Sequence, residues 1–438
     1  MEQSSLTQNI QDCFAAGKLG IEPGSLSGTV RVPQSKSMAH RALIMAFLSG
    51  DLSLARIDAC NVSDDIAATR AALEQLQAVM NRSVSEDAEP VIIDCKESGS
   101  TLRFLIPLVA VLGIPTRFIG RGRLPRRPIR EYEQVFAGSG AQMIYLDETG
   151  LSLPLEIRGK MTCGDYELPG NVSSQYISGL LMALSAAEGP STLRLTTVLE
   201  SKPYVDMTCQ VMEEFGVQVE SSEAGYTLPG GGKPHREAGA FAVERDYSQA
   251  AFWLVANYLG ADIVLEDLPE GTRQGDRAIV KLLEGLRATE EQADETGERA
   301  VFEMDARDVP DLVPVFAVAA SATGCETRII HGERLRLKES DRIASTADLL
   351  SALGADVTIT ADGLQIRGRS IRKEKKVFQG GSVNSYADHR LVMAAAIAAL
   401  GAEGPIWISA PGAVEKSYPG FFEEYCNLGG EIYGINVG

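Results

Sequence analysis

Lys36 and Arg41 lie in the stretch VPQSKSMAHRALIMAFLSG, which begins at Val32 and passes from a short polar loop into a long apolar run. Because the run has helical length, Ser35, Lys36 and Ser37 fall where the first backbone N–H groups of a helix lack intrahelical partners. Arg41 follows about one turn later, on the side that faces the loop. Such a helix start binds phosphate or carboxylate well. Alternatively, Ser35 or Ser37 merely caps the helix.

This arrangement recurs six times along the chain as a small polar cluster, an apolar run, a glycine and a short β-rich segment. The apolar runs are 38–48, 100–112, 175–187, 249–259, 312–323 and 389–400. They are apolar on nearly all sides, which predicts buried helices, and the glycine after each run predicts a C-cap. An amphipathic series at 64–76, 203–215 and 340–353 predicts half-exposed helices between them.

The polar clusters before the apolar runs share one face of a domain if its buried helices run parallel. They are Ser35, Lys36 and Ser37; Glu97, Ser98, Gly99 and Ser100; Ser173, Ser174 and Gln175; Asp246 and Ser248; Asp311; and Asp388, His389 and Arg390. Cations at these junctions and at the amphipathic helix starts are Lys36, Arg41, Arg103, Arg127, Lys338, Arg342, Arg390 and Lys416. A single polar cap needs only a structural explanation, but repeated caps with cations indicate an anion-binding face. Substrates rich in phosphate and carboxylate fit this face.

The length of 438 residues, with 45% hydrophobic and 23% charged positions, predicts a globular α/β protein with two or three domains. Two sets of repeats would divide near 241–246, after PGGGKPHREAGA, which we interpret as a loop. No apolar run approaches the ~20 residues of a membrane span, and the first residues lack the pattern of a signal peptide. We therefore expect a cytoplasmic protein.

Several function classes are disfavoured by composition. The formal net charge of −18 argues against binding of nucleic acid or of an anionic membrane. The cysteines are scattered and never form C-x-x-C, which argues against a disulfide framework and a zinc site; they are Cys13, Cys60, Cys95, Cys163, Cys209, Cys325 and Cys426. The four histidines have no metal-ligand spacing, and no G-x-x-x-x-G-K-[ST] motif is present. We expect no metal and no nucleotide.

Five segments resemble, in order, motifs of the 5-enolpyruvylshikimate-3-phosphate synthase family: VPQSKSMAHRAL, LPGNVSSQYISGLLMA, SKPYVDMT, RLKESDRI and YADHRLVMA. The resemblance runs from about Ser27 to Lys416 and implies two similar domains. Each would contain three βαβαββ repeats with buried parallel helices, an inside-out α/β barrel. The implied domains are 1–34 with 245–438, and 35–244, with the active site in the cleft between them.

Members of this family transfer the enolpyruvyl group of phosphoenolpyruvate to the 5-hydroxyl of shikimate 3-phosphate, with release of phosphate, in the shikimate pathway to chorismate and the aromatic amino acids. The resemblance implies that Asp311 takes the hydroxyl proton, and that Glu339 with Lys338 manages proton transfer at the enol carbon. Lys36 would contact both substrates. The resemblance implies no cofactor, and we expect a monomer whose partners are these two small molecules.

The remaining site residues are also implied by motif. Those implied to bind shikimate 3-phosphate are Lys36, Ser37, Arg41, Ser173, Ser174, Gln175, Ser201, Tyr204, Asp311 and Lys338. Those implied to bind phosphoenolpyruvate are Lys36, Gly99, Arg127, Gln175, Arg342, Arg390 and Lys416. Without the resemblance, Asp311 could equally be an N-cap and Glu339 a solvated ion pair. The chain has Glu97 and Arg334 where the family commonly has Asn.

Protonating the enol carbon creates positive charge beside a carboxylate and a phosphate, so cations must screen the anions while a carboxyl stays available as the acid. Two alternatives remain. One is the enolpyruvyl transferase that acts on UDP-N-acetylglucosamine, which uses a cysteine in a mobile loop, whereas the comparable stretch GRGRLPRRP has none. The other is a noncatalytic relative that binds anions.

Overall fold

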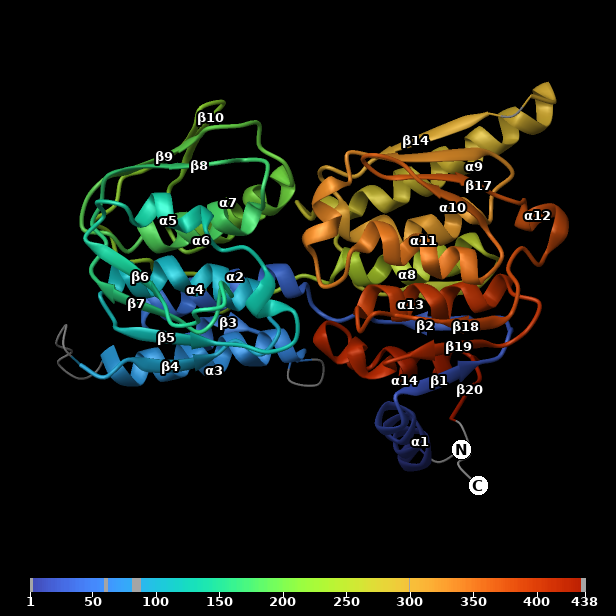
Figure 1. Ribbon diagram of the computed structural model, residues 1–438, viewed down its shortest axis with the longest axis horizontal. Coiled ribbons are helices and arrows are strands. Elements are labelled where there is room, and N and C mark those ends of the chain that lie inside the picture. Colours follow the sequence, from blue (N-terminus) through green and yellow to red (C-terminus); the bar gives the residue numbers. More distant parts are fainter. Residues whose placement is uncertain (1–2, 59–61, 81–87, 299, 435–438) are drawn as a thin grey trace. The chain divides into compact units, whose positions relative to one another are not determined.

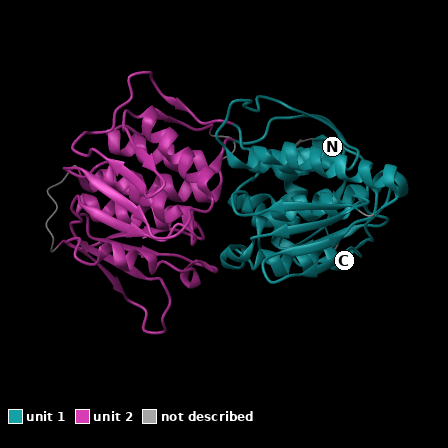
Figure 2. Ribbon diagram, turned by 90° about the horizontal axis from the view of Figure 1, so that it is seen from above, with its two compact units in different colours: residues 1–33, 245–438 teal, residues 34–244 magenta. Residues whose placement is uncertain are grey.

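The computed structural model describes residues 3–58, 62–80, 88–298 and 300–434. The chain forms two compact units, coloured separately in Figure 2. Unit 1 consists of Met1–Pro33 and Arg245–Gly438, and unit 2 consists of Gln34–Glu244. The chain therefore leaves unit 1 after Pro33 and returns to it after Glu244. Helices alternate with strands in both units, which confirms the predicted α/β class (Figure 1).

Unit 2 contains two copies of a strand–helix–strand–helix–strand–strand pattern. The first copy consists of β4 (Val91–Asp94), α4 (Gly99–Leu112), β5 (Thr116–Ile119), α5 (Glu131–Phe136), β6 (Ala141–Tyr145) and β7 (Leu155–Gly159). The second consists of β8 (Asp165–Leu168), α6 (Ser174–Leu184), β9 (Ser191–Leu195), α7 (Lys202–Glu214), β10 (Glu220–Ser222) and β11 (Gly225–Leu228). The sheet orders β4-β5-β7-β6 and β8-β9-β11-β10 correspond, with the first pair parallel and the others antiparallel.

The third part of unit 2 combines both ends of its segment of chain. Its elements are α2 (Lys36–Ser49), β3 (Ala55–Arg56), α3 (Asp64–Met80) and β12 (Phe241–Ala242). β12 pairs in parallel with β3, so that Phe241 lies opposite Ala55. Ser35 also donates its backbone N–H to the carbonyl oxygen of Glu244 at 2.7 Å. These two contacts hold the first and last residues of unit 2 close together.

Unit 1 has the same organisation. One copy consists of β14 (Val301–Asp305), α10 (Val313–Ser321), β15 (Glu326–Ile330), α11 (Arg342–Ala352), β16 (Asp356–Ile359) and β17 (Leu364–Arg367). Another consists of β18 (Gly381–Val383), α13 (His389–Ala398), β19 (Ile406–Ser409), α14 (Phe421–Asn427) and β20 (Ile432–Tyr433), with β1 (Lys18–Ile21) inserted between β19 and β20. The third consists of β2 (Ser27–Val30), α8 (Tyr247–Tyr258), β13 (Asp262–Leu265) and α9 (Ala278–Thr296). The short α12 (Ile371–Glu374) precedes β18.

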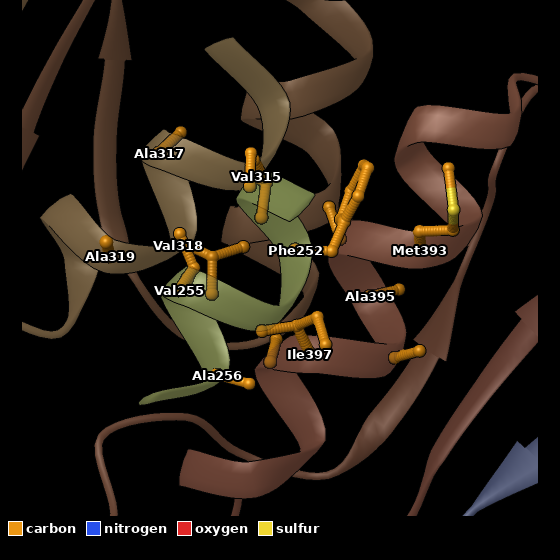
Figure 3. Packing of buried hydrophobic residues seen from close by; sticks show 14 of the residues in the cluster. Phe252, Val255, Ala256, Val315, Ala317, Val318, Ala319, Met393, Ala395 and Ile397 are labelled. Carbon is orange, nitrogen blue, oxygen red and sulfur yellow. The ribbon is translucent and has the colours of Figure 1, made fainter. Parts of the chain in front are cut away.

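The core of unit 1 lies between α8, α10 and α13, whose apolar side chains interlock in Figure 3. Phe252 and Val255 from α8 meet Val315 and Val318 from α10, and Ile397 from α13 lies beside them. Every residue of α10 and α13 is buried, as their uniformly apolar sequences predicted. In unit 2 the corresponding helices are α2, α4 and α6, which are equally enclosed. The predicted buried helices are therefore confirmed.

The predicted glycine C-caps are only partly correct. Gly50 and Gly113 end α2 and α4 in the left-handed region, with φ of 91° and 68°. Gly260 has φ of 106° one position after the C-cap of α8. At Gly189, Gly324 and Gly401 the prediction is wrong, because α6, α10 and α13 end earlier, at C-caps Ser185, Ala322 and Ala399. Those caps need no positive φ.

The beginning of the chain, which the sequence analysis left without predicted structure, forms helix α1 (Gln3–Ala16). Residues 229–240 form a loop, as predicted. The cysteines that the structure describes are free thiols, and Cys60 lies outside the described residues. Among the described helices, none is both long enough and apolar enough to cross a bilayer.

Candidate active site

In unit 1, the predicted catalytic residues come from helix starts that share one end of the core. Asp311 lies in the 3-10 turn Pro310–Leu312 just before α10, and its side chain does not cap that helix. Arg342 is the first residue of α11, and Arg390 is the second residue of α13. Arg390 Nη2 donates to Asp311 Oδ2 at 2.8 Å, so the N-termini of α10 and α13 lie at the same end of the unit. This arrangement is the shared face that the repeat predicted.

Arg342 is the centre of this cluster and is 1% exposed. Its Nη1 donates to Asp311 Oδ1 at 2.7 Å, and its Nη2 donates to Glu339 Oε2 at 2.8 Å. Its Nε donates to Asp388 Oδ2 at 2.9 Å. Burial alone would lower the pKa of Arg342, but Asp388, Glu339 and Asp311 raise it well above its ordinary value. The guanidinium is therefore a permanently charged anchor that faces several carboxylates.

Asp311 accepts hydrogen bonds from both Arg342 and Arg390, and Lys338 Nζ lies 3.7 Å from its Oδ1. Burial would raise the pKa of Asp311, but the positive charges of Arg390, Lys338 and Arg342 outweigh burial and hold that pKa far below its ordinary value. Asp311 is therefore ionised at neutral pH. A fixed carboxylate among cations can accept a proton once those cations take other anions as partners.

Asp388 was noted as part of a polar cluster but was not predicted as a site residue. It is the N-cap of α13, where it accepts the backbone N–H of Arg390 at 3.0 Å, and it is fully buried. Ser340 Oγ donates to its Oδ2 at 3.0 Å. Burial alone would raise the pKa of Asp388, but the charges of Arg342 and His389 outweigh burial and hold that pKa below its ordinary value. Asp388 thus fixes the orientation of Arg342.

Asp276 is a buried acid that the sequence analysis missed altogether. It lies in the 3-10 turn Gly275–Arg277 before α9, is 4% exposed, and accepts a hydrogen bond from Ser248 Oγ at the start of α8. Burial and the nearby charge of Asp311 raise its pKa to about 7. Asp276 therefore keeps its proton to a higher pH than Asp311 does, although the charge of Arg390 lowers the pKa of both.

Lys416 is the last residue of the 3-10 segment η8 (Pro411–Lys416). Its Nζ donates to the carbonyl oxygen of Ala387 at 2.9 Å, next to Asp388 in the turn that leads into α13. Lys416 therefore belongs to the same end of unit 1 as Arg342 and Arg390. The unit 1 cluster is accordingly Asp311, Lys338, Glu339, Arg342, Asp388, Arg390 and Lys416.

In unit 2, Ser35 is the N-cap of α2 and accepts the backbone N–H of Met38 at 3.4 Å, so the capping alternative holds for Ser35. Lys36, the first residue of α2, forms a 2.9 Å salt bridge with Asp65 Oδ2 near the start of α3. The side chains of Lys36 and Asp65 are 16% and 14% exposed, so this pair is shielded from solvent. Asp65 was not predicted as a site residue.

Arg41 binds elements that are far apart in the sequence. Its Nε donates to Thr208 Oγ1 at 2.6 Å, and its Nη2 donates to the carbonyl oxygen of Tyr204 at 2.9 Å, both in α7. Its Nη1 donates to the carbonyl oxygen of Ser37 at 2.5 Å. Burial lowers the pKa of Arg41 to about 10, which still leaves the side chain charged at neutral pH. Ser201, the residue before α7, has φ of 55° and is 3% exposed.

Gln175 joins the starts of α4 and α6. It accepts from Arg103 Nη1 at 2.7 Å through Oε1 and donates from Nε2 to Ser100 Oγ at 2.9 Å. Ser173 caps α6 by accepting the backbone N–H of Gln175 at 3.3 Å, and Ser174 is buried beside it. The starts of α4 and α6 are therefore joined by hydrogen bonds into one polar surface.

Arginine side chains approach the backbone of Gly99 closely. A Cβ at this position would lie 2.6 Å from Arg127 Nη1 and 3.1 Å from Arg103 Nη1. Arg127 itself is 8% exposed, and its carbonyl oxygen accepts from Ser152 Oγ at 2.8 Å. Two guanidinium groups thus converge on the first turn of α4, where backbone N–H groups are directed outward.

The two departures from the family pattern lie at different kinds of position. A Cβ on Gly122, which has φ of 63°, would lie 2.5 Å from Glu97 Oε2, so the Glu97 carboxylate rests against the arginine-rich loop 120–128. Arg334 lies in the 3-10 segment Glu333–Leu337 and donates from Nη2 to the carbonyl oxygen of Arg307 at 2.8 Å.

A chain of buried side chains beneath this surface was not predicted. His40 Nδ1 lies 2.8 Å from Thr69 Oγ1, which lies 2.7 Å from Thr101 Oγ1. Thr101 in turn donates to Ser98 Oγ, the N-cap of α4, at 2.7 Å. Burial, together with Lys36 and Arg41, keeps the pKa of His40 well below its ordinary value, so this histidine is neutral. Through these contacts it connects α2, α3 and α4.

The part of the chain that the structure describes contains no group of histidine, cysteine or carboxylate side chains arranged to hold a metal ion. The site is therefore described by its cations, carboxylates and helix starts alone. Such an arrangement can hold phosphate and carboxylate groups and can exchange protons through Asp311 and Glu339.

Comparison with known proteins identifies close relatives. The sequence model of EPSP synthase (3-phosphoshikimate 1-carboxyvinyltransferase) matches residues 21–425. The 3-phosphoshikimate 1-carboxyvinyltransferase of Clostridium perfringens is 39% identical over 434 residues, which cover 95% of this chain and 99% of the relative. The enzyme of the same name from Clostridium kluyveri is 40% identical, over 96% of this chain and 99% of the relative.

Solved structures agree with this match. The EPSP synthase of Acinetobacter baumannii is 25% identical and superposes with a TM-score of 0.72, over 95% of this chain and 99% of that chain. The enolpyruvyl transferase NikO of Streptomyces tendae superposes with a TM-score of 0.65 at 17% identity, which supports the fold alone.

Proposed function

Because this chain belongs to the EPSP synthase (3-phosphoshikimate 1-carboxyvinyltransferase) family, we propose that it transfers the enolpyruvyl group of phosphoenolpyruvate to the 5-hydroxyl of shikimate 3-phosphate, with release of phosphate. It is an enolpyruvyl transferase of the shikimate pathway, which serves the synthesis of aromatic amino acids. The observation that supports the assigned roles most directly is the position of Asp311 between Arg342, Arg390 and Lys338.

Phosphoenolpyruvate is proposed to bind the cations of the unit 1 cluster. Its carboxylate and phosphate would approach Arg342, Arg390 and Lys416, with Gly99 and Arg127 in unit 2 as further contacts. Arg342 and Arg390 now hold the carboxylate of Asp311. An incoming anion would share those positive charges and weaken their hold on Asp311, which raises its pKa.

Asp311 would therefore become a stronger base after the anionic substrate has bound, and it would accept the proton of the 5-hydroxyl. Glu339, hydrogen-bonded to Arg342 Nη2 at 2.8 Å, would take up a proton from solvent when the bound substrate anions raise its affinity for protons, and would deliver that proton to the enol carbon as the hydroxyl oxygen adds to the neighbouring carbon. It would then take a proton back from the resulting methyl group as phosphate leaves, with Lys338 nearby for charge balance. Both carboxylates would thus exchange their cation partners for substrate before they transfer protons.

Shikimate 3-phosphate is proposed to bind the surface of unit 2 formed by the starts of α2, α6 and α7. The residues proposed to hold it are Lys36, Ser37, Arg41, Ser173, Ser174, Gln175, Ser201 and Tyr204. Arg41 is buried against α7 and remains charged, which suits a phosphate ligand better than an exposed side chain that must be ordered on binding.

We further propose that the two clusters act on one pair of substrates, in a cleft that closes when shikimate 3-phosphate binds. Like charges on the facing walls would keep the empty cleft open. The enzyme is proposed to be a cytoplasmic monomer. Small-angle scattering with and without shikimate 3-phosphate tests the closure, since an unchanged radius of gyration would contradict it.

A coupled phosphate-release assay tests the reaction. With phosphoenolpyruvate, shikimate 3-phosphate should give phosphate and UDP-N-acetylglucosamine should not. If phosphate is released only with UDP-N-acetylglucosamine, the protein is instead the enolpyruvyl transferase that acts on this nucleotide sugar. The absence of release with either acceptor, with binding of both shikimate 3-phosphate and phosphoenolpyruvate intact by calorimetry, would favour the noncatalytic relative.

A further inference from the structure

Helix α1 (Gln3–Ala16) precedes the part of the chain that matches the family, which begins at residue 21. It is amphipathic: Ile10 is fully buried and Cys13 is 1% exposed, whereas Gln11 and Asp12 are exposed. The helix packs against α14, which lies beside it in Figure 1, and against the 3-10 segment η8 (Pro411–Lys416). Helix α1 thus contacts the segment that carries Lys416.

Phe14 makes the side-chain contact between α1 and η8. A Cβ on Gly412 would lie 3.4 Å from Phe14 Cγ, so the ring covers the backbone of η8 where no side chain intervenes. The same ring packs edge-on against Phe422 of α14, with centroids 6.1 Å apart. Phe14 therefore lies against both η8 and the helix that follows it.

The turn after α1 makes a second contact, through the backbone. The carbonyl oxygen of Gly17 accepts the N–H of Ala410 at 2.8 Å. Ala410 is the residue just before η8 and has φ of 45°, a left-handed conformation that is unfavourable for a residue with a Cβ. This hydrogen bond continues the antiparallel pairing of β1 with β19, in which Lys18 lies opposite Ser409, so the start of η8 is also held by that sheet.

Segment η8 also packs against α13, and further support from α1 stabilises it because 3-10 hydrogen bonds have poorer geometry than those of an α-helix. Its far end is held by Val414, whose carbonyl oxygen accepts the N–H groups of Ser417 and Tyr418 at 3.0 and 2.7 Å. Lys416 lies within that last turn and reaches Ala387. A shift of η8 would therefore move the ammonium group of Lys416.

We propose that α1 is a brace that positions Lys416 for phosphoenolpyruvate by holding η8 in place through Phe14, in addition to the pairing of β1 with β19. The proposal rests on the proposed function, since it takes Lys416 as a contact of phosphoenolpyruvate. Phe14 is a positioning residue in this account, because it touches η8 and acts on the substrate only through Lys416.

The test compares Phe14→Ala with a matched control, Phe302→Ala. Phe302 is also a half-buried phenylalanine of unit 1. It lies on β14 and packs against Phe316 of the core. Phe14→Ala should raise the KM for phosphoenolpyruvate about tenfold, since small displacements of a binding group are costly. The KM for shikimate 3-phosphate should change less than about twofold. Phe302→Ala should leave both values near wild type, and Phe14→Leu should restore most of the affinity.

Hydrogen exchange of the backbone amides of residues 412–418 provides a readout that needs no activity. In Phe14→Ala these amides should exchange faster than in wild type, while amides of α10 remain protected. Unchanged exchange at 412–418 would overturn the brace, whether or not the enzyme is active. Faster exchange with an unchanged KM for phosphoenolpyruvate would overturn the positioning of Lys416. Failure of the proposed function would appear separately, as a wild-type protein without phosphate release.

Discussion

Arg342 Nη1 donates to Asp311 Oδ1 at 2.7 Å, so the proposed base and a proposed substrate-binding cation are direct partners within unit 1. Arg342 also binds Asp388, a fully buried carboxylate that keeps the guanidinium in place when Asp311 moves. The positive charge is therefore fixed, and the proposed mechanism requires that Asp311 exchange this partner for the substrate hydroxyl. The predictions below follow from this and related contacts.

Asp311→Asn keeps the shape of the side chain and removes its negative charge. Turnover should fall by roughly a hundredfold or more, since a general base contributes mainly in the transition state. Binding of shikimate 3-phosphate, measured by calorimetry, should stay within a few-fold of wild type. Asp262→Asn, at an exposed aspartate on β13, is the control. Loss of binding together with turnover would contradict the role of Asp311 as a base.

Lys36→Ala should impair both the binding of shikimate 3-phosphate and turnover, because Lys36 is proposed to contact both substrates. The substitution also leaves Asp65 without its 2.9 Å salt bridge in a shielded position, which adds to the loss. Lys160→Ala removes an exposed salt bridge with Glu188 in the same unit and should change neither property. Normal binding by Lys36→Ala in calorimetry would refute the assignment.

Asp276 should make unit 1 less stable as the pH rises. Its pKa of about 7 in the folded protein exceeds the ordinary value near 4, so the folded state retains a proton that the unfolded state has lost. Its contribution to stability is therefore full below pH 4 and is lost as the pH rises towards 7. Asp311 and Asp388, whose pKa values are depressed, act in the opposite sense and at lower pH.

Asp276→Asn removes this titration. The free energy of unfolding of the variant relative to wild type should be greater at pH 8 than at pH 5, as measured by denaturant unfolding. Glu424, whose pKa is also raised to about 7, titrates in both proteins and cancels in the difference. A difference that is independent of pH would show that Asp276 titrates normally in the folded state.

Glu97 tests how the chain tolerates a carboxylate at a helix start proposed to bind an anion. At about 6 Å, an ionised carboxylate would oppose a phosphate charge by about 3 kcal/mol at an effective dielectric of 20. The Glu97 carboxylate rests against Gly122 in a loop that also carries Arg121, Arg123 and Arg127, so we expect arginine to compensate its charge. Glu97→Gln should then change the affinity for phosphoenolpyruvate only a few-fold at neutral pH.

The alternative for Glu97 is protonation when phosphoenolpyruvate enters. Affinity of the wild type would then improve steeply as the pH falls, and Glu97→Gln would bind tightly throughout. Measurement of the affinity against pH for both proteins separates the two cases. A steep slope in the wild type that disappears in the variant would rule out compensation by arginine.

The sequence by itself determined the buried helices and the residue types at their starts. Runs such as 313–321 and 391–398 are apolar on nearly every side, so they are stable only when enclosed, and this local pattern needs no knowledge of distant residues. The motifs around Lys36, Gln175 and Arg342 likewise identified the family directly. The glycine caps were less predictable, because a helix can end before its glycine when packing stops it earlier.

Only the tertiary structure decided which charges are partners. Asp311 and Arg390 are separated by 79 positions and meet at 2.8 Å, and Ser248 meets Asp276 across 28 positions. The depressed pKa of Asp311 and the raised pKa of Asp276 follow from these neighbours, since both side chains are aspartates at helix starts. The burial of a side chain and the charges near it depend on every element that packs around it. Their combined effect on its pKa therefore exists only in the folded chain.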